Sequence, residues 1–302
     1  MPEPIPYDEF AYFADNAREF DIPFHGRPVV HRIEVPMEDG RPLSALVWGT
    51  GPPEVVLLHG GAQNAHTWDT VALALGRSLV AVDLPGHGHS AGGRAGSLTL
   101  EANAADVAQV MRELAPQARL LVGMSLGGLT SILVCAAAPE LVRSLLLVDV
   151  TPGVDQEKAS AITSFINGPE SFADFDEILA RTIQFNPTRT ESSLRRGILH
   201  NALQREDGSW VWRYARFRAD EQPADGHRFD YGALWAALGA VTAPVTLARG
   251  MRPQSVVDDA DEAELLRRQP TARVVRFEES GHSIQGDQPV ELADLIAGLL
   301  DA

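Results

Sequence analysis

Residues 118–138 read ARLLVGMSLGGLTSILVCAAA, and this stretch decides the fold. It begins with an apolar run typical of a buried strand and ends with a pattern typical of a buried helix. Between the two lies the motif G-x-S-x-G, from Gly123 to Gly127, with Ser125 at its centre. A tight turn from strand to helix holds such a serine in strained geometry, and the glycines let neighbouring backbone come close. We therefore expect the Ser125 hydroxyl to stand exposed above a sheet as a candidate nucleophile.

Short apolar segments alternate with amphipathic helical patterns along the chain. This alternation is typical of a mostly parallel sheet that is covered by helices on both faces. Continuous valine and leucine runs without polar alternation indicate strands that are buried on both faces. The sequence therefore predicts an α/β fold with an eight-stranded sheet, in which the first two strands form an antiparallel pair. The expected strands are 31–37, 43–49, 54–60, 78–84, 118–124, 142–150, 244–250 and 272–278, and helices are expected at 100–114 and 290–300.

Residues 151–242 differ from the rest, because they lack valine-rich strand runs and carry more aromatic residues and arginines. We interpret them as a helical cap inserted into a core domain that residues 1–150 and 243–302 form. The alternative is that part of this segment continues the sheet. Aromatic side chains of the cap are candidates either for the roof of an apolar pocket or for the cap's own core: Phe165, Trp210, Trp212, Tyr214 and Phe217.

The charge of the chain argues against a polyanionic partner. Its 302 residues carry a formal net charge of −16, and the pI is near 4.9. Such a surface repels phosphate backbones and anionic lipids. No uncharged apolar run reaches the ~18 residues of a membrane span, and the N-terminus has no leader pattern. We therefore expect a cytoplasmic protein with neither nucleic acid nor membrane as partner. The single cysteine, Cys135, lies in an apolar run and is expected to be buried.

A serine nucleophile needs a base, and His282 is the best placed of the nine histidines. It follows the last expected strand, which puts its imidazole at the carboxyl edge of the sheet. Ser125 is expected at this edge, and open α/β sheets bind their ligands there. A carbonyl attacked by the serine also develops negative charge, which needs preorganised donors. The backbone N–H of Leu126 is one candidate for such an oxyanion hole.

Successive segments resemble the landmarks of the α/β-hydrolase superfamily, in the order that family has them: LLHGGAQNAHTW, AVDLPGHGHS, GMSLGG, LLLVDVTP and ESGHSIQGDQPVELA. They cover the chain from about residue 43 to the end, except the cap. The resemblance implies the α/β-hydrolase fold, with catalytic residues in the order serine, acid, histidine. It also implies that the loop His59-Gly60-Gly61 supplies the second oxyanion donor. We choose the Gly61 amide for this role and expect the His59 side chain to brace the loop.

The acid that orients His282 has three candidates. The family's acid normally lies a few residues beyond the second-to-last strand, but positions 253–255 hold no carboxylate. Asp258 and Asp259 come later, where capping of the following helix is their structural role. Asp149 ends the strand before the cap, at a distance from the serine that resembles branches of the superfamily with the acid at this strand end. We therefore predict Asp149, with Asp258 and Asp259 as the alternatives.

The resemblance implies a hydrolase, without cofactor or metal, that cleaves a carboxylic ester, lactone or thioester through an acyl-enzyme on Ser125. The expected partner is a small, hydrophobic, ester-like molecule; the oligomeric state is left open. One rival is a hydrolase of carbon–carbon bonds in a diketone-type ring-cleavage product, which uses the same triad. Another is a noncatalytic receptor that keeps the hydrolase residues. Four side chains are expected at the substrate pocket: Trp68, Met124, Trp210 and Trp212.

Overall fold

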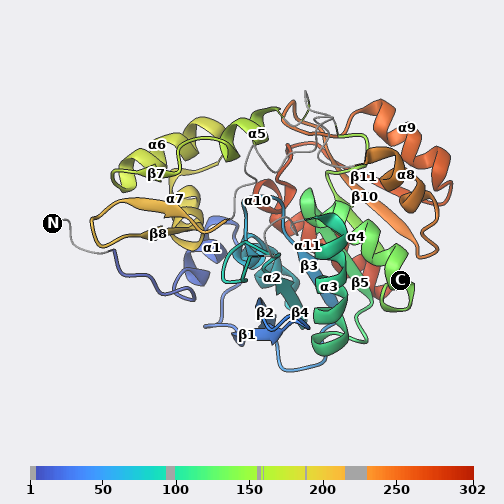
Figure 1. Cartoon of the computed structure of the whole chain (residues 1–302), viewed down its shortest axis with the longest axis horizontal. Coiled ribbons are helices and arrows are strands. Elements are labelled where there is room, and N and C mark those ends of the chain that lie inside the picture. The colour runs from blue at the N-terminus through green and yellow to red at the C-terminus, as the bar shows by residue number, and fades with distance from the viewer. Residues whose placement is uncertain (1–4, 93–98, 155–157, 159, 188, 215–229) are drawn as a thin grey trace.

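A central eight-stranded sheet organises the molecule, as predicted (Figure 1). The computed structural model describes residues 5–92, 99–154, 158, 160–187, 189–214 and 230–302. The strand order is β1-β2-β4-β3-β5-β6-β10-β11, and the pairs β1–β2 and β2–β4 are antiparallel while the other neighbours are parallel. The strands are β1 (Val30–Pro36), β2 (Pro42–Trp48), β3 (Val55–Leu58), β4 (Leu79–Val82), β5 (Leu120–Met124), β6 (Leu145–Val148), β10 (Val245–Gly250) and β11 (Arg273–Phe277).

Side chains of one strand alternate between two hydrophobic clusters, one on each face of the sheet. In β3, Val56 and Leu58 belong to one cluster, while Val55 and Leu57 belong to the other. Burial on both faces explains why this strand reads as a continuous apolar run. The first cluster includes side chains of α3 (Leu100–Leu114), α4 (Leu126–Ala137) and α8 (Tyr231–Gly239); the second includes those of α1 (Phe13–Glu19), α2 (Asp69–Leu75) and α11 (Pro289–Asp301).

The strand order reverses at β3, and this reversal positions the candidate site. The chain runs from β3 to its neighbour β4 and then crosses back to β5 on the other side of β3. The loops that follow β3 and β5 therefore leave the sheet in opposite directions and open a crevice at the carboxyl ends of these strands. The loop from His59 onward and Ser125 lie at this crevice, because they follow β3 and β5 directly.

Residues 160–214, which we call the insertion, form a separate small unit between β6 and β10. The insertion is not wholly helical, because it contains a three-stranded antiparallel sheet in the order β7-β9-β8. It also has a hydrophobic cluster of its own, around Ile178 and Trp210. Its elements are α5 (Ser160–Ile166), β7 (Ser171–Phe172), α6 (Phe175–Phe185), α7 (Glu191–Asn201), β8 (Ala202–Gln204) and β9 (Trp210–Trp212).

Helix α8 falls inside the segment expected as cap, but it packs with the helices of the large sheet. Its side chains Leu234 and Leu238 are buried in the same cluster as those of α4. Figure 1 shows α8 beside α9 (Asp259–Arg268), on the opposite side of the molecule from α6 and α7. The division of the chain at residues 151 and 242 remains a prediction.

Three short helices complete the described elements: η1 (Ala65–Trp68), η2 (Pro139–Leu141) and α10 (Ile284–Asp287). Among the helices that the structure describes, none combines the length and the apolar character that crossing a bilayer requires.

Candidate active site

The turn that carries Ser125 is the tightest part of the site. Ser125 lies between β5 and α4 with φ 51° and ψ −118°, a backbone conformation that residues other than glycine rarely adopt. The neighbouring glycines are required by close contacts. A Cβ on Gly127 would lie 2.5 Å from the carbonyl oxygen of Leu58, and one on Gly123 would lie 2.5 Å from that of Gly127. The strand–turn–helix geometry is therefore the one that the motif predicts.

Backbone strain is concentrated at this crevice. The described residues other than glycine with positive φ are Asp21, Ala62, Ser125 and Asp149. Three of these four come after strands of the large sheet: Ala62 after β3, Ser125 after β5 and Asp149 after β6. Their φ values are 60°, 51° and 45°. Such conformations persist only where the surrounding structure holds them, and they cluster at functional sites.

His282 and Asp149 meet as a hydrogen-bonded pair. Nδ1 of His282 lies 3.0 Å from Oδ2 of Asp149. His282 follows β11 in a loop that Arg252 holds by donating its backbone N–H to Ser280 at 2.9 Å. Among the described residues, Nε2 of His282 has no hydrogen-bond partner although it is buried. The pair thus leaves free the ring nitrogen that a serine hydroxyl needs, a contact that often tightens only when substrate is bound.

Four donors surround the Asp149 carboxylate, which is fully buried. Oδ1 accepts from the backbone N–H of Gly250 at 2.9 Å and from the hydroxyl of Ser255 at 2.6 Å. Oδ2 accepts from the backbone N–H of Val256 at 3.1 Å, in addition to its contact with His282. A buried carboxylate is tolerated only when its oxygens are paired in this way. The donors also fix the carboxylate plane relative to the imidazole.

The two alternative acids have structural partners instead. Asp258 is the N-cap of α9 and forms a capping box with Asp261. The hydrogen bond from Lys158 and those from the helix N-terminus lower the pKa of Asp258 to about 2. Asp259 is exposed and pairs with Arg249 at 2.8 Å. In the described hydrogen bonds, neither carboxylate contacts His282.

The loop after β3 lies directly against the serine. A Cβ on Gly60 would lie 3.2 Å from Cβ of Ser125, so this backbone approaches the candidate nucleophile closely. Within the part of the chain that is described, no acceptor takes the backbone N–H of Gly61 or that of Leu126. Both amides therefore have the free donors that an oxyanion hole requires.

His59 braces this loop, which is the role expected of it. Its Nε2 accepts from the backbone N–H of Leu84 at 2.9 Å, and its Nδ1 lies 2.7 Å from the Gly60 carbonyl oxygen. Burial lowers the pKa of His59, so the ring is held neutral. A neutral ring with one donor and one acceptor fits both contacts.

A cavity of about 200 Å³ lies between the insertion and the core, next to the loop after β3. Core residues on its wall include Ala62, Gln63 and Gln285. Ser125, Asp149 and His282 are not among its lining residues. Gln63 joins the cavity wall to the loop beside the serine, because its Oε1 accepts from the Gly60 N–H at 3.1 Å. Most of the remaining lining side chains are polar, and apolar surface comes from Phe20, Phe165, Leu194, Ile198 and Trp212.

The four side chains expected at a pocket lie in different places. Trp212 lines the cavity. Trp68 and Met124 do not, because both are buried in the cluster that packs against α2 and α11. Trp210 is buried in the insertion's own cluster, the alternative considered for the cap aromatics. Phe217 lies outside the described residues.

Two residues of the site were missed by sequence reasoning. Ser255 was noted as a position without a carboxylate, as in branches of the superfamily with a serine in this loop, but not as a donor to Asp149, which its hydroxyl supports. Its place in the loop after β10 was the signal that could have identified it. Gln63 carries no pattern of its own, because its role depends on how the loop after β3 turns.

Comparison with known proteins places this geometry in a family. A family model described as "Alpha/beta hydrolase family" matches residues 55–295. The chain is 44% identical to esterase Rv0045c of Mycobacterium tuberculosis, and the match covers 97% of this chain and 96% of that protein. It is 30% identical to the 2-(acetamidomethylene)succinate hydrolase of Mesorhizobium japonicum, and this match covers 84% of this chain and 90% of that protein.

Solved structures agree with these matches. One structure of the Mycobacterium tuberculosis esterase, described in work on its inhibition by transition metals, superposes with a TM-score of 0.85 at 43% identity. It covers 99% of this chain, and this chain covers all of it. The structure of an E-2-(acetamidomethylene)succinate hydrolase gives a TM-score of 0.79 at 27% identity, over 90% of this chain and all of the other. The fold, the family match and the identity over nearly the whole chain agree, and the chain belongs to the alpha/beta hydrolase family.

Proposed function

We propose that the protein is a serine esterase, with Ser125 as nucleophile, His282 as general base and Asp149 as the acid of the triad. The observation that carries the proposal is the 3.0 Å contact between His282 Nδ1 and Asp149 Oδ2, at the same sheet edge as the strained Ser125 turn. The relative with 44% identity over nearly the whole chain is named an esterase, which supports the same reaction.

Acylation uses the free nitrogen of His282. Nε2 accepts the Ser125 proton while Oγ attacks the ester carbonyl, and the carbonyl oxygen takes up the negative charge. The amides of Gly61 and Leu126 are the proposed donors to this oxyanion. When the intermediate collapses, the carbon–oxygen bond to the alcohol breaks and Nε2–H protonates the leaving alkoxide. The acyl group remains on Ser125.

Deacylation repeats these steps with water. His282 Nε2 takes a proton from water as its oxygen attacks the acyl carbon, and the same proton returns to Ser125 Oγ when the acid leaves. Asp149 accepts the hydrogen bond from Nδ1–H throughout, which holds the tautomer and stabilises the imidazolium that forms twice per turnover.

The substrate in this proposal is a small molecule with a carboxylic ester, lactone or thioester group. The cavity combines Phe165 and Trp212 with polar side chains, so a purely apolar substrate would leave polar groups there without partners. We propose that the insertion acts as the cap that selects the substrate. A cytoplasmic location belongs to the same proposal, and the single buried cysteine is compatible with a reducing compartment.

The two rival functions make different predictions for the same experiment. A carbon–carbon bond hydrolase uses the same triad but turns over a diketone in preference to an ester. A noncatalytic receptor with these residues reacts with an active-site phosphonate but releases no product from any ester.

The test combines labelling with turnover. We expect a fluorophosphonate probe to label Ser125, and a panel of short p-nitrophenyl esters to be hydrolysed by the wild-type protein. Ser125→Ala should abolish labelling and lower kcat by at least about 10,000-fold, since only binding and the oxyanion donors remain. Its melting temperature should stay within a few degrees of wild type.

Two outcomes contradict the proposal. Ester turnover by Ser125→Ala within tenfold of wild type would show that another group is the nucleophile. Labelling without turnover on the whole panel would contradict the esterase, and turnover of a diketone would then separate a carbon–carbon bond hydrolase from the receptor.

A further inference from the structure

A second cluster of histidine and carboxylate side chains lies apart from the triad, where the insertion meets the core. It consists of His66 on η1, Asp69 at the first position of α2 and His200 near the end of α7. All three are buried. The two imidazole rings are stacked, with centroids 3.9 Å apart and an interplanar angle of 14°. Each of the three residues has a ligating atom within 4.8 Å of the ligating atoms of the other two.

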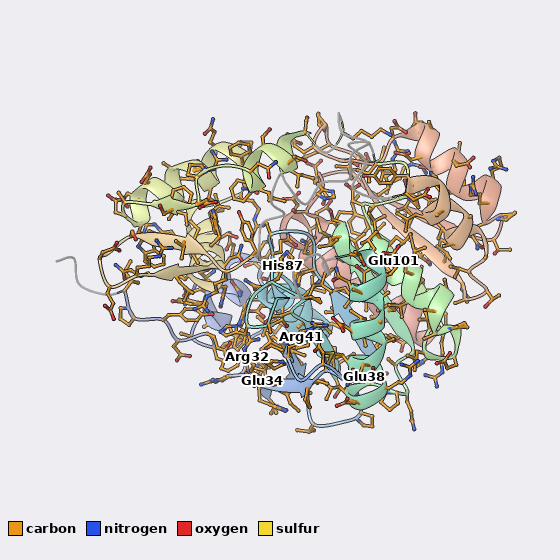
Figure 2. All side chains as sticks on the ribbon, in the orientation of Figure 1. Arg32, Glu34, Glu38, Arg41, His87 and Glu101 are labelled. Carbon is orange, nitrogen blue, oxygen red and sulfur yellow. The ribbon has the colours of Figure 1, made fainter. Side chains whose placement is uncertain are left out.

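The outer nitrogen of each ring is held by another side chain. Nδ1 of His200 lies 2.9 Å from the hydroxyl of Tyr7, and Nε2 of His66 lies 3.3 Å from Oε2 of Glu9. Arg32, on the edge strand β1 (Figure 2), also approaches that Nε2, at 3.2 Å, and pairs with the same Glu9 carboxylate. A carboxylate or hydroxyl partner on the far nitrogen is the usual way in which proteins orient histidines that bind a metal.

The inner nitrogens face the same oxygen of Asp69. Nδ1 of His66 lies 2.8 Å from Oδ2, and Nε2 of His200 lies 3.9 Å from it. The second oxygen, Oδ1, is buried and has no hydrogen-bond partner among the described residues. A buried carboxylate oxygen without a donor is costly, and a cation is one way to compensate it.

These spacings are close to those of a coordinated ion. Metal bonds of about 2.0–2.2 Å to nitrogen and oxygen place neighbouring ligand atoms roughly 3.3 Å apart in a tetrahedral site. Binding therefore requires the His66 Nδ1–Asp69 Oδ2 contact to widen and the His200 Nε2–Asp69 Oδ2 contact to shorten, each by roughly 0.5 Å. Because a metal lies in the plane of each imidazole that it binds, the two stacked rings must also tilt out of their stack so that both nitrogens point at the same ion. His66 and His200 also line the cavity, so water has access to the fourth position.

We propose that His66, Asp69 and His200 bind one divalent transition-metal ion of the zinc, cobalt, nickel or copper class. Two imidazole nitrogens and a single carboxylate favour these ions over magnesium and calcium, which take oxygen ligands. The ion takes the place of the proton shared by His66 Nδ1 and Asp69 Oδ2, and this proton is released to solvent on binding.

The ion joins the insertion to the core beside the proposed oxyanion loop. Asn64 already donates to the His200 carbonyl oxygen at 3.1 Å, and Asn201 donates to the Ala62 carbonyl oxygen at 2.6 Å. A metal bond between α7 and η1 strengthens this same junction. Because the ion binds only the folded arrangement, the melting temperature rises with the concentration of free ion and continues to rise after the site is saturated.

The test uses the full chain without a histidine tag, freed of metal with a chelator and then titrated with Co²⁺ or Zn²⁺. We expect one ion per chain to survive gel filtration, the visible absorption of four-coordinate Co²⁺, and a higher melting temperature. X-ray absorption of the Zn²⁺ form should show two imidazole ligands in the wild-type protein. This measurement does not depend on whether any variant folds.

Variants separate this site from adventitious binding. Asp69→Asn and His200→Gln should weaken Co²⁺ binding by at least about 100-fold, and Tyr7→Phe should weaken it about 10-fold by releasing the far nitrogen of His200. His31→Gln, which removes an exposed histidine of β1, is the matched control and should bind as wild type does.

Three results overturn the proposal: less than stoichiometric retention by the wild-type chain, fewer than two imidazoles in the Zn²⁺ spectrum, or undiminished affinity in both Asp69→Asn and His200→Gln. Each would leave the cluster as a buried hydrogen-bonded network only. None of them bears on the proposed esterase, which the Ser125 experiment tests separately.

Discussion

Asp149 illustrates how a single residue is placed by the strand before it. It follows β6 directly, so the parallel arrangement of the strands brings its carboxylate to the edge where the crevice opens. Its φ of 45° then turns the side chain toward the end of β10 and the loop that follows, where Gly250, Ser255 and Val256 supply donors. The four hydrogen bonds to the carboxylate hold Asp149 in place, and such contacts allow a strained backbone conformation to persist.

The first residue-scale prediction ranks the candidate acids. Asp149→Asn should lower kcat by about 10,000-fold, because an amide cannot hold the required His282 tautomer. It should also lower the free energy of unfolding by about 1–3 kcal/mol, since its NH2 group faces the backbone N–H of Gly250 or of Val256 in either orientation. Asp258→Asn and Asp259→Asn should keep most of the activity, since their partners belong to α9 and to Arg249. Steady-state kinetics on one p-nitrophenyl ester measures all three. The opposite ranking would show that the later loop supplies the carboxylate.

Ser255 gives a second prediction at this scale. It is a positioning residue, because its hydroxyl donates to Asp149 Oδ1 at 2.6 Å and does not contact His282. Ser255→Ala should lower kcat by about 10- to 150-fold while KM stays within twofold, since one hydrogen bond to a charged group contributes about 1.5–3 kcal/mol. Ser255→Thr should restore most of kcat. A change in KM alone, or no rescue by threonine, would contradict this role.

Among the elements, those of the large sheet could be predicted from sequence and those of the insertion could not. Six of the eight expected strands contain the observed one, because buried strands leave continuous valine and leucine runs, and the first two expected strands are displaced from the observed ones by one residue. The strands β7, β8 and β9 have two or three residues each, too few to show a period. Helix α8 is apolar around most of its surface, so its sequence does not reveal which unit it packs against.

The element-scale prediction concerns the junction of β3 and α4. Gly127→Ala places a Cβ 2.5 Å from the Leu58 carbonyl oxygen and 2.6 Å from that of His59, both of which are backbone atoms. We expect a loss of about 2 kcal/mol or more in the free energy of unfolding, with a large loss of turnover, because α4 must move away from the oxyanion loop. Urea unfolding and ester kinetics measure the two effects.

Gly298 provides the matched control for this change. It lies inside α11, and an added Cβ there meets no atom within 4 Å. Gly298→Ala should therefore stabilise the protein by about 0.5–1 kcal/mol and leave turnover unchanged. Equal effects of the two substitutions would mean that helix propensity, and not the close approach of backbone, decides the role of Gly127.

At the scale of the whole molecule, the proposed triad and the proposed metal site are both assembled from distant parts of the chain. The places of Ser125 and His282 at the ends of β5 and β11 could be predicted, because each residue follows a recognisable strand. The polar wall of the cavity and the group of His66 and His200 could not, because they form only when the insertion docks on the core. Which faces of two units meet is set by packing between them, and no local pattern records it.

Cys135 reports on the integrity of this whole assembly. Its side chain is 5% exposed in the cluster between the sheet and α4, and burial raises the pKa of its thiol to about 12. The reactive thiolate therefore forms only when the core opens. At pH 8, a thiol reagent should label wild-type protein at least about 1,000-fold more slowly than an exposed thiol, because opening constants of small domains lie in that range or beyond.

Moving the thiol one position along α4 supplies the comparison. Ala136 is exposed, so Cys135→Ala combined with Ala136→Cys turns the thiol from the core toward solvent. This variant should react at the rate of a free thiol without urea, whereas wild type should react only as urea unfolds it. Because the reagent and the pH are the same, the two measurements separate the intrinsic reactivity of the thiol from its exposure to the reagent. Rapid labelling of the native wild-type protein would mean that the core around α4 opens locally, well below the free energy of global unfolding.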